Sequence, residues 1–316
     1  MTKILTAGDH FVLNPLLRDA LARHAPADVE ISELTLPWPV QPFHAVGEVD
    51  EASGTEDELI AALRGVQVCL TQMAPLTDRV LTECPDLRLF AVTRGGPVNA
   101  NIAAATRHGV AVTYAPGRNA TATAEHTIAL LLAAVRQVPQ RNSELLDGQW
   151  RSDYYRYQDV GPEISGATVG LIGYGAIGSR VAAILHGFGA RIVVFDPFLQ
   201  PGALPEYAAQ AQAMEELLPT ADIVTVHARL TAETTGLIGK RELEMMRPGG
   251  ILINAARGGL VDYEALCDAL EDGHLYAAGL DVYPAEPLPV ASRLRKLPTA
   301  VMTPHLAGAS KPTAHK

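Results

Sequence analysis

The chain has 316 residues, of which 48% are hydrophobic and 19% charged, and its formal net charge is −10. This length and composition exclude a disordered protein and leave room for two α/β domains with buried cores. An acidic chain without a run of Lys or Arg is not typical of nucleic-acid or anionic-membrane binding, so an anionic substrate must be bound by a local basic site.

The three cysteines, Cys69, Cys84 and Cys267, lie in apolar contexts and show no metal-ligand spacing. We therefore expect buried free thiols, no bound metal, and a reducing, cytoplasmic compartment. The N-terminus lacks the apolar core and cleavage site of a signal peptide, and the longest apolar run, 128–135, is too short to span a bilayer.

Strands and helices alternate over residues 3–115. Asn14 is the expected N-cap of the first helix, because Pro15 follows it, and Thr55 with Glu58 forms an expected capping box. The proline-rich segment 37–54 is predicted to be a loop. The alternation requires a parallel sheet covered on both faces. The expected strands are 3–7, 29–34, 66–71, 87–93 and 110–115, and the expected helices are 14–25, 55–64, 78–83 and 101–108.

A long helical segment, 121–146, follows Pro116-Gly117, with Pro139 as its expected kink, and a tyrosine-rich loop at 150–161 leads into a second alternating series. The chain ends at Lys316 without a stop signal, so we expect a further helix beyond it. The sequence predicts two doubly wound, Rossmann-like parallel-sheet domains with an intervening cleft and the cofactor on the second. The expected strands of the second series are 168–172, 191–195, 223–227, 251–255, 276–282 and 300–303, and its helices are 178–188, 214–218, 240–246 and 261–270.

The second series opens with a dinucleotide-binding pattern. The apolar strand 168–172 is followed by Gly173, Gly175 and Gly178, in the spacing G-x-G-x-x-G, and then by apolar residues at helical spacing. The glycines permit a tight turn, a close approach to a pyrophosphate and close packing of helix on strand, and the helix N-terminus favours an anion. A lone match to this pattern is weak, but here the strand, the helix and Asp196, at the end of the next strand, all fit.

Asp196 also indicates which cofactor is bound. Its carboxylate can accept both ribose hydroxyls and would repel a 2′-phosphate. Pro197, Phe198 and Leu199 follow it, so no Arg or Lys is at hand to bind that phosphate. The sequence therefore predicts NAD rather than NADP.

Three segments place polar residues just past the carboxyl ends of strands, where ligands bind in such sheets. Arg257 follows strand 251–255, and its guanidinium could hold a carboxylate bidentately, although a surface arginine at a helix start is the simpler reading of that residue alone. Glu286 lies between Ala285 and Pro287 in a rigid turn. His305 follows the last strand, and a lone histidine there is more often structural, but a carboxylate within reach would stabilise its protonated form and fix its tautomer.

Together these residues suggest a reaction. Arg257 would bind a carboxylate and polarise the neighbouring carbonyl, His305 would give a proton to the carbonyl oxygen as hydride is delivered to carbon, and Glu286 would orient His305. In the reverse direction His305 would act as the base that oxidises a 2-hydroxy acid.

Four motifs occur in order and in register: GYGAIG at 173–178, NAARGGLVD at 254–262, GLDVYPAEP at 279–287 and TPHLAGAS at 303–310. Together they closely resemble the D-isomer-specific 2-hydroxyacid dehydrogenases, which include phosphoglycerate, glycerate/hydroxypyruvate, D-lactate and formate dehydrogenases. The likeness runs from about Leu87 to the C-terminus, and before Leu87 it is weak.

The resemblance implies an NAD-dependent enzyme with Arg257, Glu286 and His305 as its catalytic residues. It also implies a homodimer joined through the helix at 121–146, an NAD-binding domain at 118–290, and a substrate domain at 1–117 that is completed by 291–316. Asp281 would face the nicotinamide carboxamide, and segment 227–229 would form the adenine-side wall. The residues expected to bind the cofactor are Gly173, Gly175, Ala176, Ile177, Gly178, Asp196, His227, Ala228, Arg229, Ala255, Asp281 and Thr123.

The expected substrate loop, 93–99, departs from the glycine-small-glycine turn of the family. Gly95 and Gly96 can still offer backbone N–H groups to a carboxylate, and Arg94 is either an extra cation for a second anionic group or a solvated surface residue. His10 and Gln72 are the other candidate phosphate ligands. Formate as substrate is disfavoured, because that branch has glutamine where this chain has Glu286.

Two rival functions remain at this stage. Proteins that resemble this family also serve as NAD-sensing transcriptional corepressors, which keep the same three catalytic residues but tend to carry peptide-binding clefts and flexible tails. A lyase or hydrolase that uses NAD internally would need further acid/base residues, which are not found here. The sequence does not name the substrate, beyond a small 2-hydroxy or 2-oxo acid.

Overall fold

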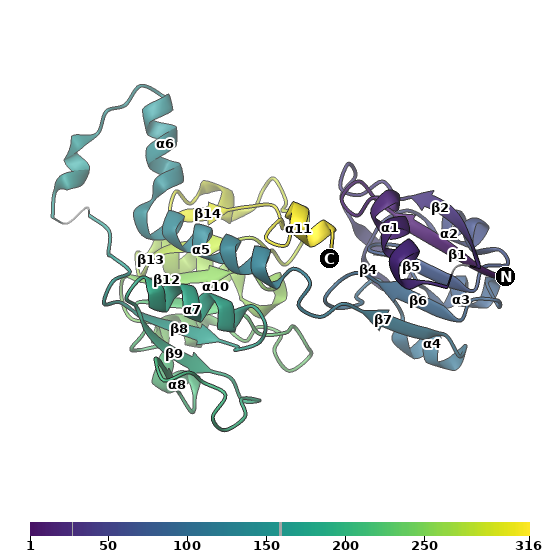
Figure 1. Cartoon of the computed structure of the whole chain (residues 1–316). Helices are drawn as coiled ribbons and strands as arrows, with labels where there is room; N and C mark the ends of the chain where they lie inside the picture. Colours follow the sequence, from purple (N-terminus) through teal and green to yellow (C-terminus); the bar gives the residue numbers. More distant parts are fainter. Residues whose placement is uncertain (27, 158–159) are drawn as a thin grey trace. The chain divides into compact units, whose positions relative to one another are not determined.

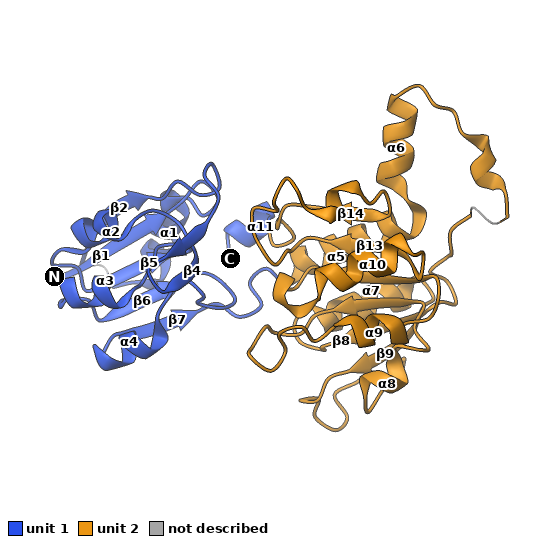
Figure 2. Cartoon of the chain, turned by 180° about the vertical axis from the view of Figure 1, so that it is seen from behind, with its two compact units in different colours: residues 1–119, 309–316 blue, residues 120–308 orange. Residues whose placement is uncertain are grey.

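The computed structural model of the chain describes residues 1–26, 28–157 and 160–316. It divides into two compact units, Met1–Asn119 with Ala309–Lys316 (unit 1) and Ala120–Gly308 (unit 2), as Figure 2 shows. Part of the predicted loop 150–161 lies outside the described residues. The chain returns to unit 1 at Ala309 and not at 291, because the last strand, near residue 301, pairs within the sheet of unit 2.

Unit 1 is built on a parallel sheet with the strand order β2-β1-β5-β6-β7, which is the flavodoxin-like doubly wound order. Apolar side chains from the sheet and from α2, α3 and α4 share one core. The predicted alternation of strands and helices in this unit is confirmed (Figure 1). Its elements are β1 (Thr2–Gly8), α1 (Asn14–His24), β2 (Val29–Thr35), β3 (His44–Val46), β4 (Val49–Ala52), α2 (Glu56–Leu63), β5 (Val68–Thr71), α3 (Asp78–Glu83), β6 (Leu89–Val92), α4 (Ile102–Arg107), β7 (Ala111–Tyr114) and α11 (Lys311–Ala314).

Two local predictions in unit 1 are wrong. Asn14 does not cap α1; its side chain is buried, accepts a hydrogen bond from Gly8 N at 2.9 Å and donates to Leu34 O at 2.9 Å, so it ties the end of β1 to β2. Segment 37–54 is not wholly loop, because β3 and β4 pair as an antiparallel hairpin. The capping box of Thr55 and Glu58 on α2 is confirmed.

Asp9, directly after β1, is a buried carboxyl group with uneven hydrogen bonding. Its Oδ1 accepts from Phe11 N at 2.8 Å and from Val12 N at 2.7 Å, whereas Oδ2 is buried without a hydrogen-bond partner among the described residues. Burial raises the pKa of Asp9 from 3.8 to about 6, against the opposing influence of the backbone hydrogen bonds and of Arg118. The folded protein therefore holds this proton at pH values where the unfolded chain has lost it.

We expect this group to lower stability as the pH rises. Because the folded pKa is raised, the free energy of unfolding falls between about pH 4 and pH 6, by about 3 kcal/mol in total. Asp9→Asn removes this pH dependence, because asparagine does not ionise. In urea titrations, the free energy of unfolding of the variant relative to the wild type should therefore rise by about 2 kcal/mol between pH 4.5 and pH 7.5. A stability difference that stays constant over this range would contradict the buried, protonated carboxyl.

Unit 2 carries a seven-stranded, all-parallel sheet with the order β10-β9-β8-β11-β12-β13-β14. Counted within the unit, this is the Rossmann order 3-2-1-4-5-6 with one further strand, and it reverses direction between β8 and β11. Its elements are α5 (Ala120–Arg136), α6 (Val138–Leu146), β8 (Thr168–Ile172), α7 (Gly178–Gly187), β9 (Arg191–Phe195), β10 (Ala208–Gln210), α8 (Met214–Leu217), β11 (Ile223–Val226), α9 (Lys240–Met245), β12 (Gly250–Asn254), α10 (Tyr263–Glu271), β13 (Leu275–Leu280) and β14 (Ala300–Met302), with 3-10 turns at Ser152–Tyr155, Gly258–Leu260 and Arg293–Lys296.

Helices cover both faces of this sheet. Helices α5 and α7 share one apolar cluster with its strands, and α8, α9 and α10 share another. The predicted long helix is broken between α5 and α6, because Gln137 adopts a left-handed φ of 52°, two residues before Pro139. In the part of the chain that the structure describes, no helix is long and apolar enough to cross a membrane.

Candidate active site

The glycine turn lies at the point where the strand order of unit 2 reverses. Gly173 has a φ of +98°, and a side chain on it would meet the backbone of His227 and Ala228 within 2.9 Å. A Cβ on Gly178, the first residue of α7, would lie 2.3 Å from Gly173 O. At Gly175 an added Cβ meets nothing within 4 Å, so the backbone there is open to a ligand. The first and third glycines thus serve packing, and the second leaves the backbone accessible.

Asp196 is linked to this turn. Its Oδ2 accepts a hydrogen bond from Tyr174 N at 2.8 Å, and its Oδ1 accepts one from Phe198 N at 2.9 Å. The carboxylate is therefore fixed at the end of β9, beside the residue that follows Gly173. Each oxygen retains a lone pair that can accept a ribose hydroxyl.

The neighbouring strand β11 ends in the predicted segment 227–229. Burial lowers the pKa of His227 to about 4, so its ring is neutral at pH 7, and its Nε2 lies 3.0 Å from Thr225 Oγ1. Arg229 is exposed and Ala255, after β12, is buried. Thr123 of α5 is buried, and its Oγ1 has no hydrogen-bond partner among the residues that the structure describes. The open Gly175 backbone, the fixed Asp196 carboxylate and this orphan hydroxyl fit a bound dinucleotide.

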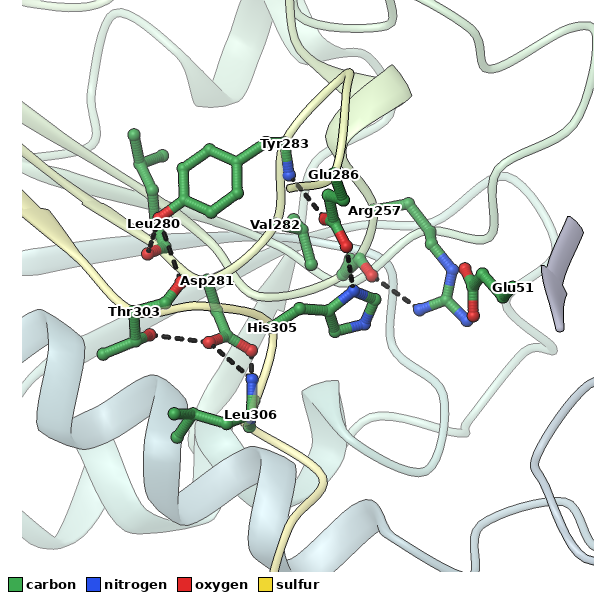
Figure 3. Close-up of polar contacts among 12 residues, drawn as sticks. Glu51, Arg257, Leu280, Asp281, Val282, Tyr283, Glu286, Thr303, His305 and Leu306 are labelled. Carbon is green, nitrogen blue, oxygen red and sulfur yellow. Dashed lines mark hydrogen bonds and ion pairs between the residues drawn. The ribbon is translucent and has the colours of Figure 1, made fainter. Parts of the chain in front are cut away.

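His305 and Glu286 form a close pair. His305 Nδ1 lies 2.5 Å from Glu286 Oε2, and Glu286 Oε1 accepts a hydrogen bond from Tyr283 N at 2.8 Å (Figure 3). The two side chains are 22% and 16% exposed, respectively. Since the carboxylate occupies Nδ1, the imidazole is oriented so that Nε2 is the nitrogen through which a proton can be exchanged with a ligand. The structure thus brings together two residues that lie 19 positions apart.

Arg257 lies beside this pair (Figure 3). Asn254 donates from Nδ2 to Arg257 O at 2.9 Å, which ties the loop to the end of β12. A Cβ on Gly258 would lie 2.0 Å from the Tyr283 backbone, so only glycine lets this loop pack against the loop that carries Glu286. The sequence motif therefore uses Gly258 to bring the guanidinium to the acid/base pair, and the surface-arginine reading of Arg257 is not supported.

Asp281 anchors the loop that follows β14. Its side chain has no exposed surface, and it accepts hydrogen bonds from Thr303 Oγ1 at 2.6 Å, from Leu306 N at 3.0 Å and from Ala307 N at 2.7 Å. These hydrogen bonds tie the end of β13 to the segment 303–307. The contact of Asp281 with the nicotinamide carboxamide stays a prediction.

That anchor holds His305 in an unusual conformation. His305 has a left-handed φ of 52°, and its N–H donates to Asp281 O at 2.8 Å. From α5, His126 Nε2 lies 2.9 Å from Thr303 Oγ1, and Tyr283 Oη donates to Thr303 O at 2.9 Å. The sequence analysis did not single out His126 or Thr303 for this network. The only available signal was the position of Thr303 in the motif, because the contact with α5 depends on the fold.

In unit 1, the expected substrate loop follows β6. Gly95 is exposed, and an added Cβ on Gly96 meets nothing within 4 Å, so both backbones are accessible. Arg94 is not a solvated residue: it is 17% exposed and forms an ion pair with Glu51. Arg118 is buried and donates to Thr93 Oγ1 at 2.9 Å. Glu51 and Arg118 were missed, because neither belongs to a motif and both act through distant segments.

A nucleotide-binding turn and a proton-transfer pair on one parallel sheet are typical of dinucleotide-dependent oxidoreductases. Residues 128–307, more than half of the chain, match the family described as D-isomer specific 2-hydroxyacid dehydrogenase, NAD binding domain. The chain belongs to this family, and unit 2 contains its NAD-binding domain.

Relatives and solved structures agree with this assignment. D-3-phosphoglycerate dehydrogenase of Mycobacterium tuberculosis is 42% identical over 255 residues, which are 80% of this chain and 47% of that protein. Glyoxylate reductase of Korarchaeum cryptofilum is 34% identical over 84% of this chain and 80% of its own length. The crystal structure of the TT0316 protein from Thermus thermophilus has a TM-score of 0.82 and 33% identity, covering 99% of this chain and 92% of that one. The chain spans about half the length of the phosphoglycerate dehydrogenases that it matches.

Proposed function

We propose that the chain interconverts a D-2-hydroxy acid and the corresponding 2-oxo acid with NAD as the redox partner. The observation that carries the proposal is the 2.5 Å contact between His305 Nδ1 and Glu286 Oε2 beside Arg257. NAD supplies the hydride acceptor or donor when bound. The residues of the chain supply the proton and the binding of the acid.

Arg257 binds the substrate carboxylate, because a planar guanidinium matches a carboxylate with two parallel hydrogen bonds. His305 gives a proton from Nε2 to the carbonyl oxygen during reduction and takes it back during oxidation. Glu286 stabilises the imidazolium and fixes the ring orientation. The accessible backbone N–H groups of Gly95 and Gly96 are further candidate donors to the substrate.

The proposal is tested by NADH oxidation with glyoxylate, pyruvate, hydroxypyruvate and longer 2-oxo acids. We expect turnover on at least one of these acids and on its D-hydroxy acid in reverse. Tight NADH binding without turnover on any acid would contradict the enzyme and favour the corepressor function instead.

We expect a strong preference for NADH over NADPH, because the fixed Asp196 carboxylate would repel a 2′-phosphate. Repulsion of several kcal/mol predicts that kcat/KM with NADH is about 100 times that with NADPH, or more. Asp196→Asn should lower this ratio of NADH to NADPH at least about tenfold. The control Glu244→Gln removes an exposed carboxylate from α9 and should not change the ratio. Equal use of both cofactors by the wild type would contradict this role of Asp196.

We also infer a homodimer that forms through the arm after α5, by which we mean α6 (Val138–Leu146) and the residues that follow it as far as Tyr157. Helix α6 has no buried residue, and large apolar side chains on the arm are exposed. A patch of this kind marks an interaction surface. Light scattering should give twice the mass of the chain, and Leu146→Asp should lower it, while a monomeric wild type would contradict the inference. The exposed apolar residues of the arm are Val138, Leu145, Leu146, Trp150, Tyr155 and Tyr157.

We place the protein in a reducing compartment such as the cytoplasm. Its three cysteines are buried free thiols, as predicted.

A further inference from the structure

A charged pair lies at the carboxyl edge of the unit 1 sheet. Arg94 follows β6, and its Nη2 pairs with the carboxylate of Glu51 on the β3–β4 hairpin, while its Nη1 donates to Glu51 O at 3.2 Å. The side chains of Arg94 and Glu51 are only 17% and 16% exposed. The guanidinium charge is therefore compensated in place, with a carboxylate beside it.

Glu51 is held in a strained conformation. Its φ is +46°, in the left-handed region that a glutamate rarely adopts. Such a conformation persists only where the surroundings over-determine it, and it is common at ligand sites. Arg94 supplies that constraint, because it contacts both the backbone oxygen and the carboxylate of Glu51. The pair therefore behaves as one fixed unit.

Gln72, another candidate anion ligand at this edge, contacts Arg118. Gln72 Oε1 accepts a hydrogen bond from Arg118 Nη2 at 3.1 Å, and Arg118 Nε donates to Thr313 O at 2.9 Å. The Asp9 carboxyl group also lies near enough to Arg118 to affect its pKa. Of the two guanidiniums, of Arg94 and of Arg118, that of Arg94 forms an ion pair with a carboxylate.

This edge is also where a ligand is expected. The strand order of unit 1 reverses between β1 and β5, and ligands bind beyond the carboxyl ends of strands at such a point. Asp9 follows β1, Gln72 follows β5 and Arg94 follows β6. The accessible backbones of Gly95 and Gly96 follow Arg94 directly.

We propose that the Glu51–Arg94 pair is a specificity device that restricts the chain to 2-hydroxy and 2-oxo acids with a single anionic group. The inference rests on the proposed function and deepens it. A second anion, such as a phosphate or a distal carboxylate, would meet a compensated guanidinium and the Glu51 carboxylate, and like charges brought together disfavour binding strongly. A neutral substrate tail avoids this repulsion, and a hydroxyl on it could donate to a Glu51 oxygen.

The proposal predicts the substrate preference of the wild type directly. With saturating NADH, kcat/KM for hydroxypyruvate should exceed that for 3-phosphohydroxypyruvate by about 100-fold or more. For the same reason, kcat/KM for pyruvate should exceed that for oxaloacetate. Equal or better use of 3-phosphohydroxypyruvate would overturn the specificity device and leave the proposed function intact. Absence of turnover on every 2-oxo acid would overturn the proposed function itself, and the substrate class with it.

Variants of Glu51 then test whether this residue sets the preference. Glu51→Gln removes the charge, and Glu51→Asn removes it with a residue that tolerates a left-handed φ. Each variant should lower the ratio of kcat/KM for hydroxypyruvate to kcat/KM for 3-phosphohydroxypyruvate at least about tenfold. The change should come mainly from a lower KM for 3-phosphohydroxypyruvate. The matched control is Glu33→Gln. It removes the carboxylate of Glu33, on β2, from an exposed ion pair with Arg18, on α1, and should leave the ratio of the two kcat/KM values unchanged. Equal effects of the Glu51 variants on both substrates would show a merely structural pair and overturn the proposal.

Discussion

Replacement of His305 by Asn is expected to lower kcat for 2-oxo acid reduction about 10³-fold while leaving the affinity for NADH unchanged. General acid catalysis by a positioned side chain contributes typically about 10² to 10⁴ in rate, and His305 is the residue that Glu286 orients for this task. Steady-state kinetics give kcat, and quenching of protein fluorescence by NADH gives the affinity. The control is His24→Asn, at the exposed end of α1. A His305→Asn variant with wild-type kcat would remove His305 from the mechanism.

Glu286→Gln separates orientation from proton transfer. Glutamine can still contact Nδ1, but it does not stabilise the imidazolium. We therefore expect Glu286→Gln to lower kcat for 2-oxo acid reduction, but by less than His305→Asn does, and to leave the affinity for NADH unchanged. A variant with wild-type kcat would contradict the pairing of Glu286 with His305 as a catalytic contact.

Arg257→Lys is expected to lower kcat/KM for the 2-oxo acid about 10²-fold, and Arg257→Met more than that. A lysine keeps the charge but loses the planar fork that matches a carboxylate, and charge-assisted hydrogen bonds contribute about 1.5–3 kcal/mol each. The loss should fall on the KM for the oxo acid and on kcat, with the KM for NADH unchanged. Arg241→Lys, on the exposed surface of α9, is the matched control and should behave as the wild type.

Arg257→Lys with unchanged KM and kcat would show that the guanidinium does not bind the substrate. A rise in the KM for NADH instead would place Arg257 on the cofactor side of the site. The two outcomes are distinguished by varying each substrate at saturating concentrations of the other.

Most of the fold of unit 2 could be predicted from the sequence, because its strands are short apolar runs bounded by glycine or proline. Strand β8 and strand β9 have the predicted bounds, and the helix after Gly178 ends before Gly189, which has a φ of +82°. These features depend on neighbours in the chain. Arg257, Glu286 and His305 were predicted from local sequence as well, since each lies in a segment that follows the end of a strand.

Features that depend on distant segments were missed or placed wrongly. Asn14 looks like an N-cap because Pro15 follows it, but β2 offers its side chain a buried partner. The hydrogen bonds of Asp281 to the loop at 303–307 were missed, because they join segments that are distant in the sequence. Glu51 carries no local signal at all, since its strain and its pairing with Arg94 exist only in the folded unit.

The relation to phosphoglycerate dehydrogenases also has to be weighed against the site. The chain is 42% identical to such an enzyme over 255 residues, yet in unit 1 Arg94, one of the three expected phosphate ligands, is ion-paired with Glu51. Arg257, Glu286 and His305 belong to unit 2, whereas the Glu51–Arg94 pair belongs to unit 1. Identity to a named relative is therefore a poor guide to the substrate.

The central claim is that NADH and His305 together reduce a 2-oxo acid to its D-hydroxy acid. The most direct measurement is chiral analysis of the product formed from hydroxypyruvate and NADH by the wild type and by His305→Asn. We predict D-glycerate from the wild type, in amounts equal to the NADH oxidised, and a rate about 10³-fold lower from the variant. Formation of L-glycerate, or of D-glycerate at the same rate by both proteins, would contradict the account.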